Sequence, residues 1–319
     1  MQRYEPARRR TMYFIGVTTG SSSIMKVFPA WADHLRLEAQ IRGIDFAPND
    51  EPARYAEAVR FIKDDPLSLG ALVTTHKMNL LKASRELFDE LDPYATTLGE
   101  ISSISKRGGR LIGHAKDPIS AGAAFEAIVE PGYWKRSGAT LALLGSGGSS
   151  LALTLYLHHK AQQGGDVPEK IVVTARRQSS LEEMLHVHRA IGFAIPVEYA
   201  LTPAPADADA VLAGLPARSM VVNATGLGKD RPGSPITDAA VFPEDGIAWE
   251  FNYRGNLVFL DQARAQQAAR RLRVEDGWVY FIHGWTRVIA EVFDIDLPMS
   301  GPAFDRLSQL ALQATSPRN

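Results

Sequence analysis

The 319-residue sequence contains no cysteine and no long run of apolar residues. Without cysteine there are no disulfide bonds and no thiolate metal sites, and nothing indicates an oxidising compartment. No stretch approaches the roughly 18 consecutive apolar residues that a membrane-spanning helix needs. The opening residues are basic, but their apolar part is short and runs directly into an expected strand, so we expect no cleaved signal. These features predict a soluble, cytoplasmic protein.

The sequence also lacks an excess of charge of either sign. Its 35 lysine and arginine residues stand against 36 aspartate and glutamate residues, a net charge of -1. A balanced chain has no overall field that would attract nucleic acid or an anionic membrane. The 45% hydrophobic and 22% charged residues are typical of globular proteins. We therefore expect a small-molecule substrate as partner, neither nucleic acid nor membrane, and a monomer or homodimer.

Short apolar runs alternate with longer helical patterns. Strand patterns at 12–17, 39–46 and 72–74 are each followed by a helical pattern, at 26–37, 52–62 and 77–91. This order predicts a mostly parallel sheet with helices on its faces. A second series begins at Thr140, after a turn-forming stretch at 130–138. The sequence predicts an α/β fold with two domains, of which the second has a Rossmann-type parallel sheet.

The strongest local signal is the run GSGGSS, which starts at Gly145 directly after the strand pattern 140–144. Gly145 suits a tight turn, Gly147 lets a phosphate approach the backbone, and Gly148 begins a helix whose free N–H groups suit a diphosphate. The spacing departs from the usual G-x-G-x-x-G, so a glycine-rich turn without a ligand is the alternative. The residues that we predict to bind the cofactor here are Gly145, Ser146, Gly147, Gly148 and Ser149.

Two arginines follow the next expected strand, residues 170–174. An NAD site would place an acidic residue near this position to bind the ribose hydroxyls, but the sequence has Arg176 and Arg177 there instead. A guanidinium suits a 2'-phosphate, through paired charge-assisted hydrogen bonds. We therefore predict that Arg176 and Arg177 bind NADP(H); an exposed pair of loop arginines is the alternative.

Taken in order, several segments resemble the shikimate dehydrogenase family over nearly the whole chain. Besides the glycine loop and TARR (174–177), they are GVTTGSSSIMK (16–26), GALVTTHK (70–77), GHAKDPISAG (113–122), VVNATGLG (221–228), EFNYRGNLVFL (250–260) and DGWVYFIHGW (276–285). The resemblance implies catalytic roles for Lys77 and Asp117. It also implies substrate contacts for Ser22, Thr74, Ser102, Tyr253 and His283, and cofactor contacts for Asn223, Thr225 and Gly277. With these segments in place, we predict a substrate domain of residues 1–116 and 278–319 and a Rossmann-type NADP domain of residues 117–277.

The departures from the family fall among the residues that recognise the substrate. Ile24 stands at the second carboxylate-binding serine, and Ser102 and Ala115 stand at two asparagines. His283 replaces a glutamine, and the usual proline of the lysine loop is missing. We therefore expect shikimate itself to be a poor substrate. His283 could be donor, acceptor or cation, or simply a histidine packed in its helix.

Lys77 and Asp117 suit the interconversion of an alcohol and a ketone. The hydroxyl proton must go to a positioned base, and a lysine can be that base if burial lowers its pKa, while a nearby carboxylate orients it. A solvent-facing lysine at a helix start is the alternative for Lys77, and a helix-start cap is the alternative for Asp117. The prediction is an NADP-dependent alcohol dehydrogenase acting on a shikimate-like cyclic polyol or hydroxy acid. It involves no metal, since the histidine pairs are unsuitably placed.

Two other functions are compatible with the sequence. The first is a non-catalytic, NADP(H)-responsive binding protein, although Lys77 and Asp117 are both retained. The second is a dehydrogenase of another small-molecule class, such as amino acids or folates. Asn223 and Tyr253 could also be structural residues, a turn asparagine and a packed aromatic.

Overall fold

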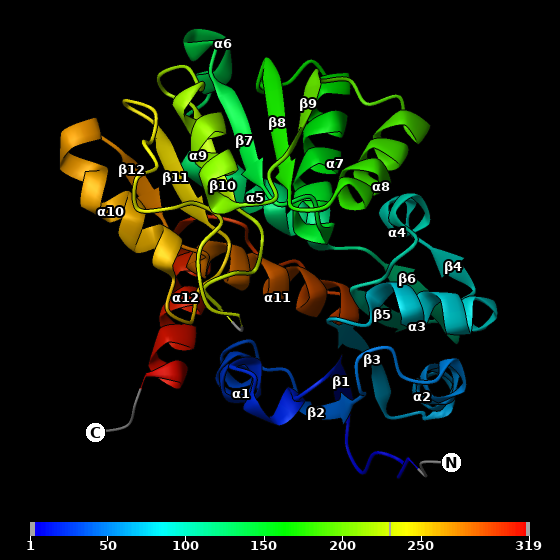
Figure 1. Ribbon diagram of the computed structural model, residues 1–319. Helices are drawn as coiled ribbons and strands as arrows, with labels where there is room; N and C mark the ends of the chain where they lie inside the picture. Colours follow the sequence, from blue (N-terminus) through cyan, green and yellow to red (C-terminus); the bar gives the residue numbers. More distant parts are fainter. Residues whose placement is uncertain (1–3, 230, 317–319) are drawn as a thin grey trace. The chain divides into compact units, whose positions relative to one another are not determined.

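The chain forms two compact units, each built on a six-stranded sheet (Figure 1). The computed structural model describes residues 4–229 and 231–316. The first unit combines the described residues up to Asp117 with those from Ile282 onward, and the second is the continuous segment Pro118–Phe281. These limits lie close to the predicted domain boundaries, and the assignment of one domain to substrate and the other to NADP stays a prediction.

The sheet of the first unit is mixed. Its strands are β1 (Thr11–Gly16), β2 (Gln40–Asp45), β3 (Ser68–Val73), β4 (Glu90–Leu91), β5 (Ser103–Arg107) and β6 (Arg110–His114), in the order β2-β1-β3-β5-β6-β4. β1 pairs in parallel with β2 and β3, whereas β5 runs antiparallel to β3 and β6. Every residue of β1 is buried, because both faces of this central strand are covered. The carboxyl ends of β1 and β3 therefore share one edge.

Helices cover both faces of this sheet. They are α1 (Ile24–His34), α2 (Pro52–Asp64), α3 (Lys77–Ser84), α4 (Pro93–Leu98), α11 (Trp278–Phe293, of which the part from Ile282 belongs here) and α12 (Gly301–Thr315), with 3-10 turns at Thr19–Ser21 and Arg85–Leu87. On one face, Tyr13 and Ile15 pack into a core with α2 and α3. On the other, Phe14 meets Trp285 of α11 edge to face, with ring centroids 5.2 Å apart. Trp31 of α1 donates a hydrogen bond from Nε1 to the Leu307 carbonyl of α12, at 2.8 Å.

One helix is shorter than the sequence pattern predicted. The pattern indicated a helix over 77–91, but α3 ends at Ser84 and is followed by a 3-10 turn and β4. The Ser84 hydroxyl donates to the Leu80 carbonyl at 2.6 Å, an arrangement that weakens the end of a helix. Leu87 and Phe88 are then both buried, which draws the chain back toward the sheet. The apolar residues of this stretch thus serve a turn and a short strand.

The sheet of the second unit is entirely parallel. Its strands are β7 (Thr140–Leu144), β8 (Lys170–Ala175), β9 (Val197–Leu201), β10 (Met220–Asn223), β11 (Ile247–Glu250) and β12 (Arg273–Glu275), in the order β12-β11-β10-β7-β8-β9. The chain proceeds from β7 in one direction to β8 and β9, and later in the other direction from β10 to β12. The order therefore reverses between β7 and β10, which is where parallel sheets of this kind bind ligands.

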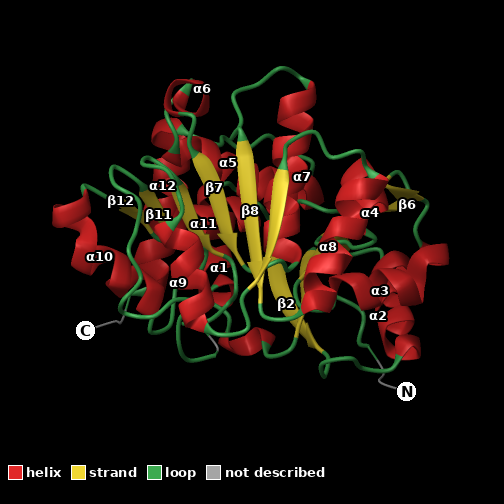
Figure 2. Cartoon of the chain, turned by 45° about the horizontal axis from the view of Figure 1, so that its top comes forward, coloured by secondary structure: helices red, strands yellow, loops and turns green. Residues whose placement is uncertain are grey.

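Helices flank this sheet as well (Figure 2). They are α5 (Asp117–Ile128), α6 (Tyr133–Ser137), α7 (Gly148–Gln162), α8 (Gln178–Ala190), α9 (Pro205–Ala213) and α10 (Val258–Arg270). Within β7, Leu141 and Leu143 belong to one apolar cluster, whereas Ala142 and Leu144 belong to another. Alternate residues of the strand thus face opposite layers. The predicted α/β fold with a Rossmann-like sheet is confirmed.

No helix in the two described stretches of chain combines the length and the apolar character needed to cross a membrane.

Candidate functional site

The glycine loop joins β7 to α7 at the reversal point of the parallel sheet. Gly145 has a φ of 111°, and a Cβ there would lie 3.0 Å from the Ala224 carbonyl oxygen, so the turn requires glycine. The Ser150 hydroxyl donates to the Gly145 carbonyl at 2.6 Å and holds the turn in place. A Cβ at Gly147 or Gly148 would meet no atom within 4 Å. The space above the loop is therefore open, next to the N-terminus of the fifteen-residue helix α7.

A cavity of about 550 Å³ lies beside this loop in the second unit. Gly145, Ser146 and Gly147 form part of its wall, and Arg176 and Arg177 contribute from the end of β8. Arg177 donates to the Ser180 hydroxyl at 3.4 Å. The loop leaves room for a phosphate and the arginines carry the charge to bind one, so these residues fit a phosphorylated dinucleotide.

A third arginine lines the same cavity and was missed from the sequence. Arg231 lies in a glycine- and proline-rich loop after β10, where its carbonyl accepts a hydrogen bond from the Gly228 N–H at 2.7 Å. The sequence signal was a cation among turn-forming residues soon after VVNATGLG. Glu183 of α8 also contributes to the wall, so the lining is not purely basic. Three guanidinium groups against one carboxylate still favour an anionic ligand.

Asn223 is fully buried at the end of β10, where it organises the chain around it. Its amide donates to Glu250 at 2.6 Å, and its carbonyl oxygen accepts from the N–H and the hydroxyl of Thr225, at 3.1 and 2.7 Å. Thr225 itself lines the cavity. The side chain of Asn223 thus shapes the loop that presents Thr225. A direct cofactor contact of either residue stays a prediction.

Glu250 is a fully buried carboxyl group that this network surrounds with amide donors. Besides Asn223, the backbone and side-chain N–H groups of Asn252 donate to it, at 2.8 and 2.6 Å. Burial raises the pKa of Glu250 to about 7, although the hydrogen bonds from Asn252 and Asn223 act in the opposite direction. The carboxyl group therefore changes its charge near neutral pH, below the loop that carries Thr225.

We expect Glu250 to make the protein less stable as the pH rises from about 4.5 to about 7. In this range the folded chain retains a proton that the unfolded chain has released, so unfolding becomes easier with rising pH. The loss is on the order of 3 kcal/mol, since each pKa unit corresponds to about 1.4 kcal/mol. Urea unfolding at pH 5 and pH 7.5 should show this difference in the unmodified protein and not in Glu250→Gln. The exposed Glu169→Gln is the control, and equal pH dependence in all three proteins would contradict the assignment.

In the first unit, Lys77 and Asp117 form an ion pair. Lys77 begins α3 just beyond the carboxyl end of β3, and its Nζ donates to an oxygen of Asp117, the first residue of α5. The two side chains are 22% and 23% exposed, enough to meet a small ligand. The pattern that placed Lys77 at the strand end therefore agrees with its position. A catalytic role for the pair stays a prediction.

The electrostatic surroundings keep Lys77 charged. Burial acts to lower its pKa, but the negative charges of Asp117 and Glu100 outweigh burial and raise the pKa above its ordinary value. The net direction is thus opposite to the lowering that the sequence argument considered for a base. Lys77 is an ammonium group at neutral pH, and its deprotonated form becomes common only in alkaline solution.

The loop before Lys77 has an unusual backbone. Thr75 has a φ of 57°, a left-handed conformation that is costly for a β-branched residue. Proline, with φ fixed near -65°, could not take this position, which gives a physical reason for a loop without one. His76 is buried beside it at the N-cap position of α3, with Nδ1 3.0 Å from the Tyr55 hydroxyl. His76 thus anchors the strained turn that presents Lys77.

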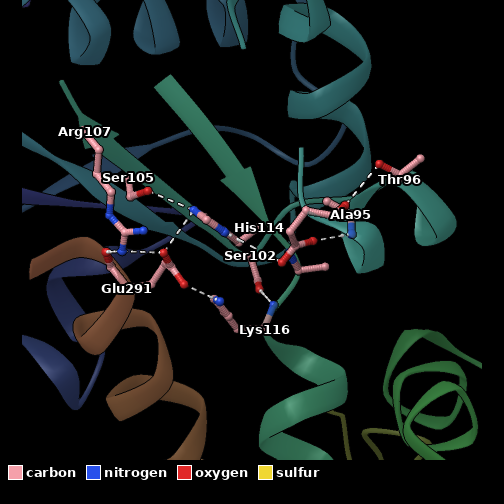
Figure 3. Close-up of polar contacts among 10 residues, drawn as sticks. Ala95, Thr96, Ser102, Ser105, Arg107, His114, Lys116 and Glu291 are labelled. Atoms are coloured by element: carbon pink, nitrogen blue, oxygen red, sulfur yellow. Dashed lines mark hydrogen bonds and ion pairs between the residues drawn. The ribbon is translucent and has the colours of Figure 1, made fainter. Parts of the chain in front are cut away.

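A second polar cluster includes Lys116, the residue that precedes Asp117 in the chain (Figure 3). The Ser102 hydroxyl accepts a hydrogen bond from the Lys116 N–H at 2.8 Å, and the Lys116 ammonium pairs with Glu291 of α11. His114 lies 2.8 Å from the Ser105 hydroxyl, and burial lowers its pKa to about 4. Ser102 is only 3% exposed and one of its lone pairs is occupied, so its substrate contact stays a prediction.

The other predicted substrate residues of the first unit have mixed surroundings. Ser22 is half-buried, and its N–H donates to the Thr19 carbonyl at 3.0 Å. The Thr74 hydroxyl donates to the Ile15 carbonyl at 3.3 Å. Ile24 is fully buried in α1 and contributes to packing. The contacts of Ser22 and Thr74 with substrate stay predictions.

His283 is fully buried, and its ring stacks on Phe304 with centroids 4.4 Å apart. Burial, assisted by the positive charge of Arg287, lowers the pKa of His283 to about 4. The ring is therefore neutral at pH 7, and a cationic role, which the sequence left open, does not apply there. Its position suits helix packing, and a substrate contact stays a prediction.

Tyr253 and Gly277 lie close together in the second unit. The Tyr253 ring stacks on Phe281 with centroids 4.0 Å apart. A Cβ at Gly277 would lie 2.2 Å from the Phe251 carbonyl oxygen, so the close approach of two backbone segments requires glycine there. These packing roles account for both residues, and their ligand contacts stay predictions.

Residues 4–229 and 231–316 bring together no group of three or more His, Asp or Glu side chains that could hold a metal ion. The expectation of a metal-free reaction stays a prediction.

Comparison with known proteins gives distant relatives. No protein-family model matches the chain. A shikimate dehydrogenase (NADP(+)) of Lactococcus lactis subsp. cremoris is 28% identical over 184 residues, 57% of this chain and 60% of the relative. One of Bacillus cereus is 32% identical over 145 residues, 45% of this chain and 48% of the relative. The chain thus spans about half the length of the curated relatives that it matches.

Solved structures agree with the fold over almost the whole chain. Shikimate dehydrogenase from Aquifex aeolicus has a TM-score of 0.73 at 16% identity, covering 97% of this chain and 100% of that one. Quinate dehydrogenase from Corynebacterium glutamicum, in complex with NAD, scores 0.71 at 19% identity, covering 96% and 99%. The 5-ketofructose reductase of a Gluconobacter strain scores 0.69 at 16% identity, covering 96% and 99%.

The parallel sheet, its glycine loop and the arginine-lined cavity define an α/β protein with a Rossmann-like unit. A second α/β unit with a mixed sheet is built from the two ends of the same chain. In sequence and in fold the chain is similar, at a distance, to shikimate and quinate dehydrogenases. The predicted resemblance is confirmed.

Proposed function

We propose that the protein is an NADP(H)-dependent oxidoreductase that interconverts a hydroxyl group and a ketone on a shikimate-like cyclic polyol or hydroxy acid. The observation that carries the proposal is the ion pair of Lys77 and Asp117 at the carboxyl end of β3. An ammonium group held by a carboxylate is a proton donor suited to a carbonyl oxygen. Curated relatives that carry out this class of reaction support the proposal.

The arginine-lined cavity supports NADP(H) as the cofactor, which accepts or supplies the hydride when bound. The glycine loop would bind the diphosphate through the free N–H groups at the start of α7. Arg176 and Arg177 would bind the 2'-phosphate. The names of two curated relatives specify NADP(+), and the quinate dehydrogenase structure holds NAD. The residues of this chain favour the phosphorylated cofactor.

Lys77 would transfer the proton in both directions. In ketone reduction its ammonium group donates a proton to the carbonyl oxygen, and in alcohol oxidation its neutral amine takes the hydroxyl proton. Asp117 orients the side chain through their hydrogen bond. Because the pKa of Lys77 is raised, the donor form dominates at neutral pH. Reduction is therefore favoured near pH 7, and oxidation should accelerate as the pH rises.

The substrate we propose differs from shikimate in its substituents. Ile24 is buried and offers no hydrogen bond where the family resemblance implies a serine for a carboxylate. A site without this hydrogen-bond partner has a much lower affinity for a substrate whose carboxylate requires one. The related structures carry the names of shikimate, quinate and 5-ketofructose enzymes, so the fold accommodates substrates with and without a carboxylate.

A substrate panel tests the proposed function. The purified protein is incubated with NADP+ or NADPH and with cyclic polyols, hydroxy acids, ketoses and amino acids, and cofactor absorbance is followed at pH 7 and pH 9. Turnover on a polyol or hydroxy acid is expected, faster in oxidation at pH 9. Tight binding of NADP(H) without turnover on any compound would instead indicate a binding protein. Turnover confined to amino acids would overturn the proposed substrate class.

A further inference from the structure

Glu100 is a third ionisable group beside Lys77 and Asp117. It follows helix α4, whose C-cap residue, Gly99, has a φ of 63°. The next residue, Ile101, donates its N–H to the Lys77 carbonyl at 3.4 Å. These contacts place Glu100 one residue from a backbone hydrogen bond to Lys77.

The same short segment is also fastened to the neighbourhood of Asp117. The Ser102 hydroxyl accepts a hydrogen bond from the N–H of Lys116, the residue that precedes Asp117. Ile101 and Ser102 are both buried, which fixes the direction of the chain on either side. Glu100 itself is half-buried. The backbone at Glu100 is therefore held between the segments that carry the proposed catalytic pair.

The electrostatic interactions agree with this placement. Burial and the charge of Asp117 raise the pKa of Glu100, whereas Lys77 acts to lower it. Glu100 in turn helps to raise the pKa of Lys77. Lys77 thus forms an ion pair with Asp117 and interacts electrostatically with Glu100 as well. Lys116, the residue before Asp117, is paired with Glu291. When both acids are ionised, Lys77, Asp117 and Glu100 together carry one surplus negative charge.

We propose that Glu100 determines substrate specificity, selecting a neutral polyol over a substrate that carries a carboxylate. The inference rests on the proposed function of the Lys77 site. A carboxylate of Glu100 can accept hydrogen bonds from hydroxyl groups of the substrate. It also repels a carboxylate on a ligand bound beside Lys77, because unit charges near a protein surface interact strongly at short range. Both effects act against an acid and in favour of an uncharged polyol.

Quinate and its methyl ester provide the probe pair, because they share ring and hydroxyl groups and differ in one negative charge. Calorimetry measures their affinities for the full-length protein, with and without NADP+. The unmodified protein should bind the ester more tightly. Glu100→Gln should shift the acid-to-ester affinity ratio at least about tenfold toward the acid, by removing one charge repulsion. The exposed Glu86→Gln is the matched control and should leave the ratio unchanged.

Three results would overturn the inference. They are an acid bound as tightly as the ester by the unmodified protein, an unchanged ratio in Glu100→Gln, and binding of neither ligand by either protein. Thermal melting checks that the variants fold. If Glu100→Gln does not fold, the comparison of acid and ester binding by the unmodified protein tests the inference. Failure of the proposed function is seen separately, as absence of NADP(H)-linked turnover on the whole panel, because the binding comparison requires no turnover.

Discussion

Replacing Lys77 by Ala is expected to lower turnover on the preferred substrate by at least about a hundredfold, the lower end of what a general acid or base contributes. The variant loses the ammonium group that would give its proton to the carbonyl oxygen. The affinity for NADP(H) should change little, since Lys77 belongs to the first unit and the arginine-lined cavity to the second. Steady-state kinetics and calorimetry measure the two quantities.

The control for this variant is Lys82→Ala, which removes an exposed lysine of the same helix, α3. Asp117→Asn should also slow turnover, because it removes the charge that orients Lys77 and raises its pKa. In that variant the rate of alcohol oxidation should reach its plateau at a lower pH than in the unmodified protein. Near-normal turnover by Lys77→Ala would refute the catalytic assignment.

Replacing Arg176 and Arg177 together by Ala should weaken NADP+ binding by about a hundredfold or more. Each charge-assisted hydrogen bond to a phosphate contributes about 1.5–3 kcal/mol, and about 1.4 kcal/mol corresponds to a tenfold change in affinity. The affinity for NAD+, which lacks the 2'-phosphate, should stay within a few-fold. Calorimetric titration of both cofactors into both proteins measures the change in preference.

Arg189→Ala serves as the control for charge, because Arg189 is an exposed arginine at the end of α8 in the same unit. The unmodified protein should prefer NADP+ by at least about tenfold. Equal binding of the two cofactors by the unmodified protein would show that the arginines do not bind the 2'-phosphate. A loss of affinity for NAD+ as large as that for NADP+ would place the arginines at the shared part of the two cofactors.

The features that the sequence predicted well depend on neighbouring residues. The strand at β7, the turn at Gly145 and the start of α7 follow one another without interruption, so one contiguous pattern specifies all three. Lys77 is likewise positioned by its own strand and helix. Local patterns of this kind reflect backbone preference and burial, both of which can be read directly from residue types.

The features that it did not predict depend on residues far apart in the chain. The side-chain amide of Asn223 is hydrogen-bonded to Glu250, and Glu100 interacts electrostatically with Lys77 and Asp117. No spacing rule connects these positions, because only the folded chain brings them together. The left-handed backbone of Thr75 could not be predicted from the sequence either, because threonine rarely adopts that conformation. Polar partnerships and strain at the candidate site therefore required the structure.

The discontinuous first unit has a consequence for the order of events during synthesis. The second unit is one continuous segment, so it has all its own strands and helices once Phe281 has left the ribosome. Helix α1, made early, needs the carbonyl of Leu307 for Trp31 and the side chains of α12 for its apolar face. The apolar residues of α1 in the nascent chain therefore stay without this packing partner while the inserted unit is synthesised and folds. We expect α1 to be most prone to aggregation, and most dependent on chaperones, during this interval of synthesis.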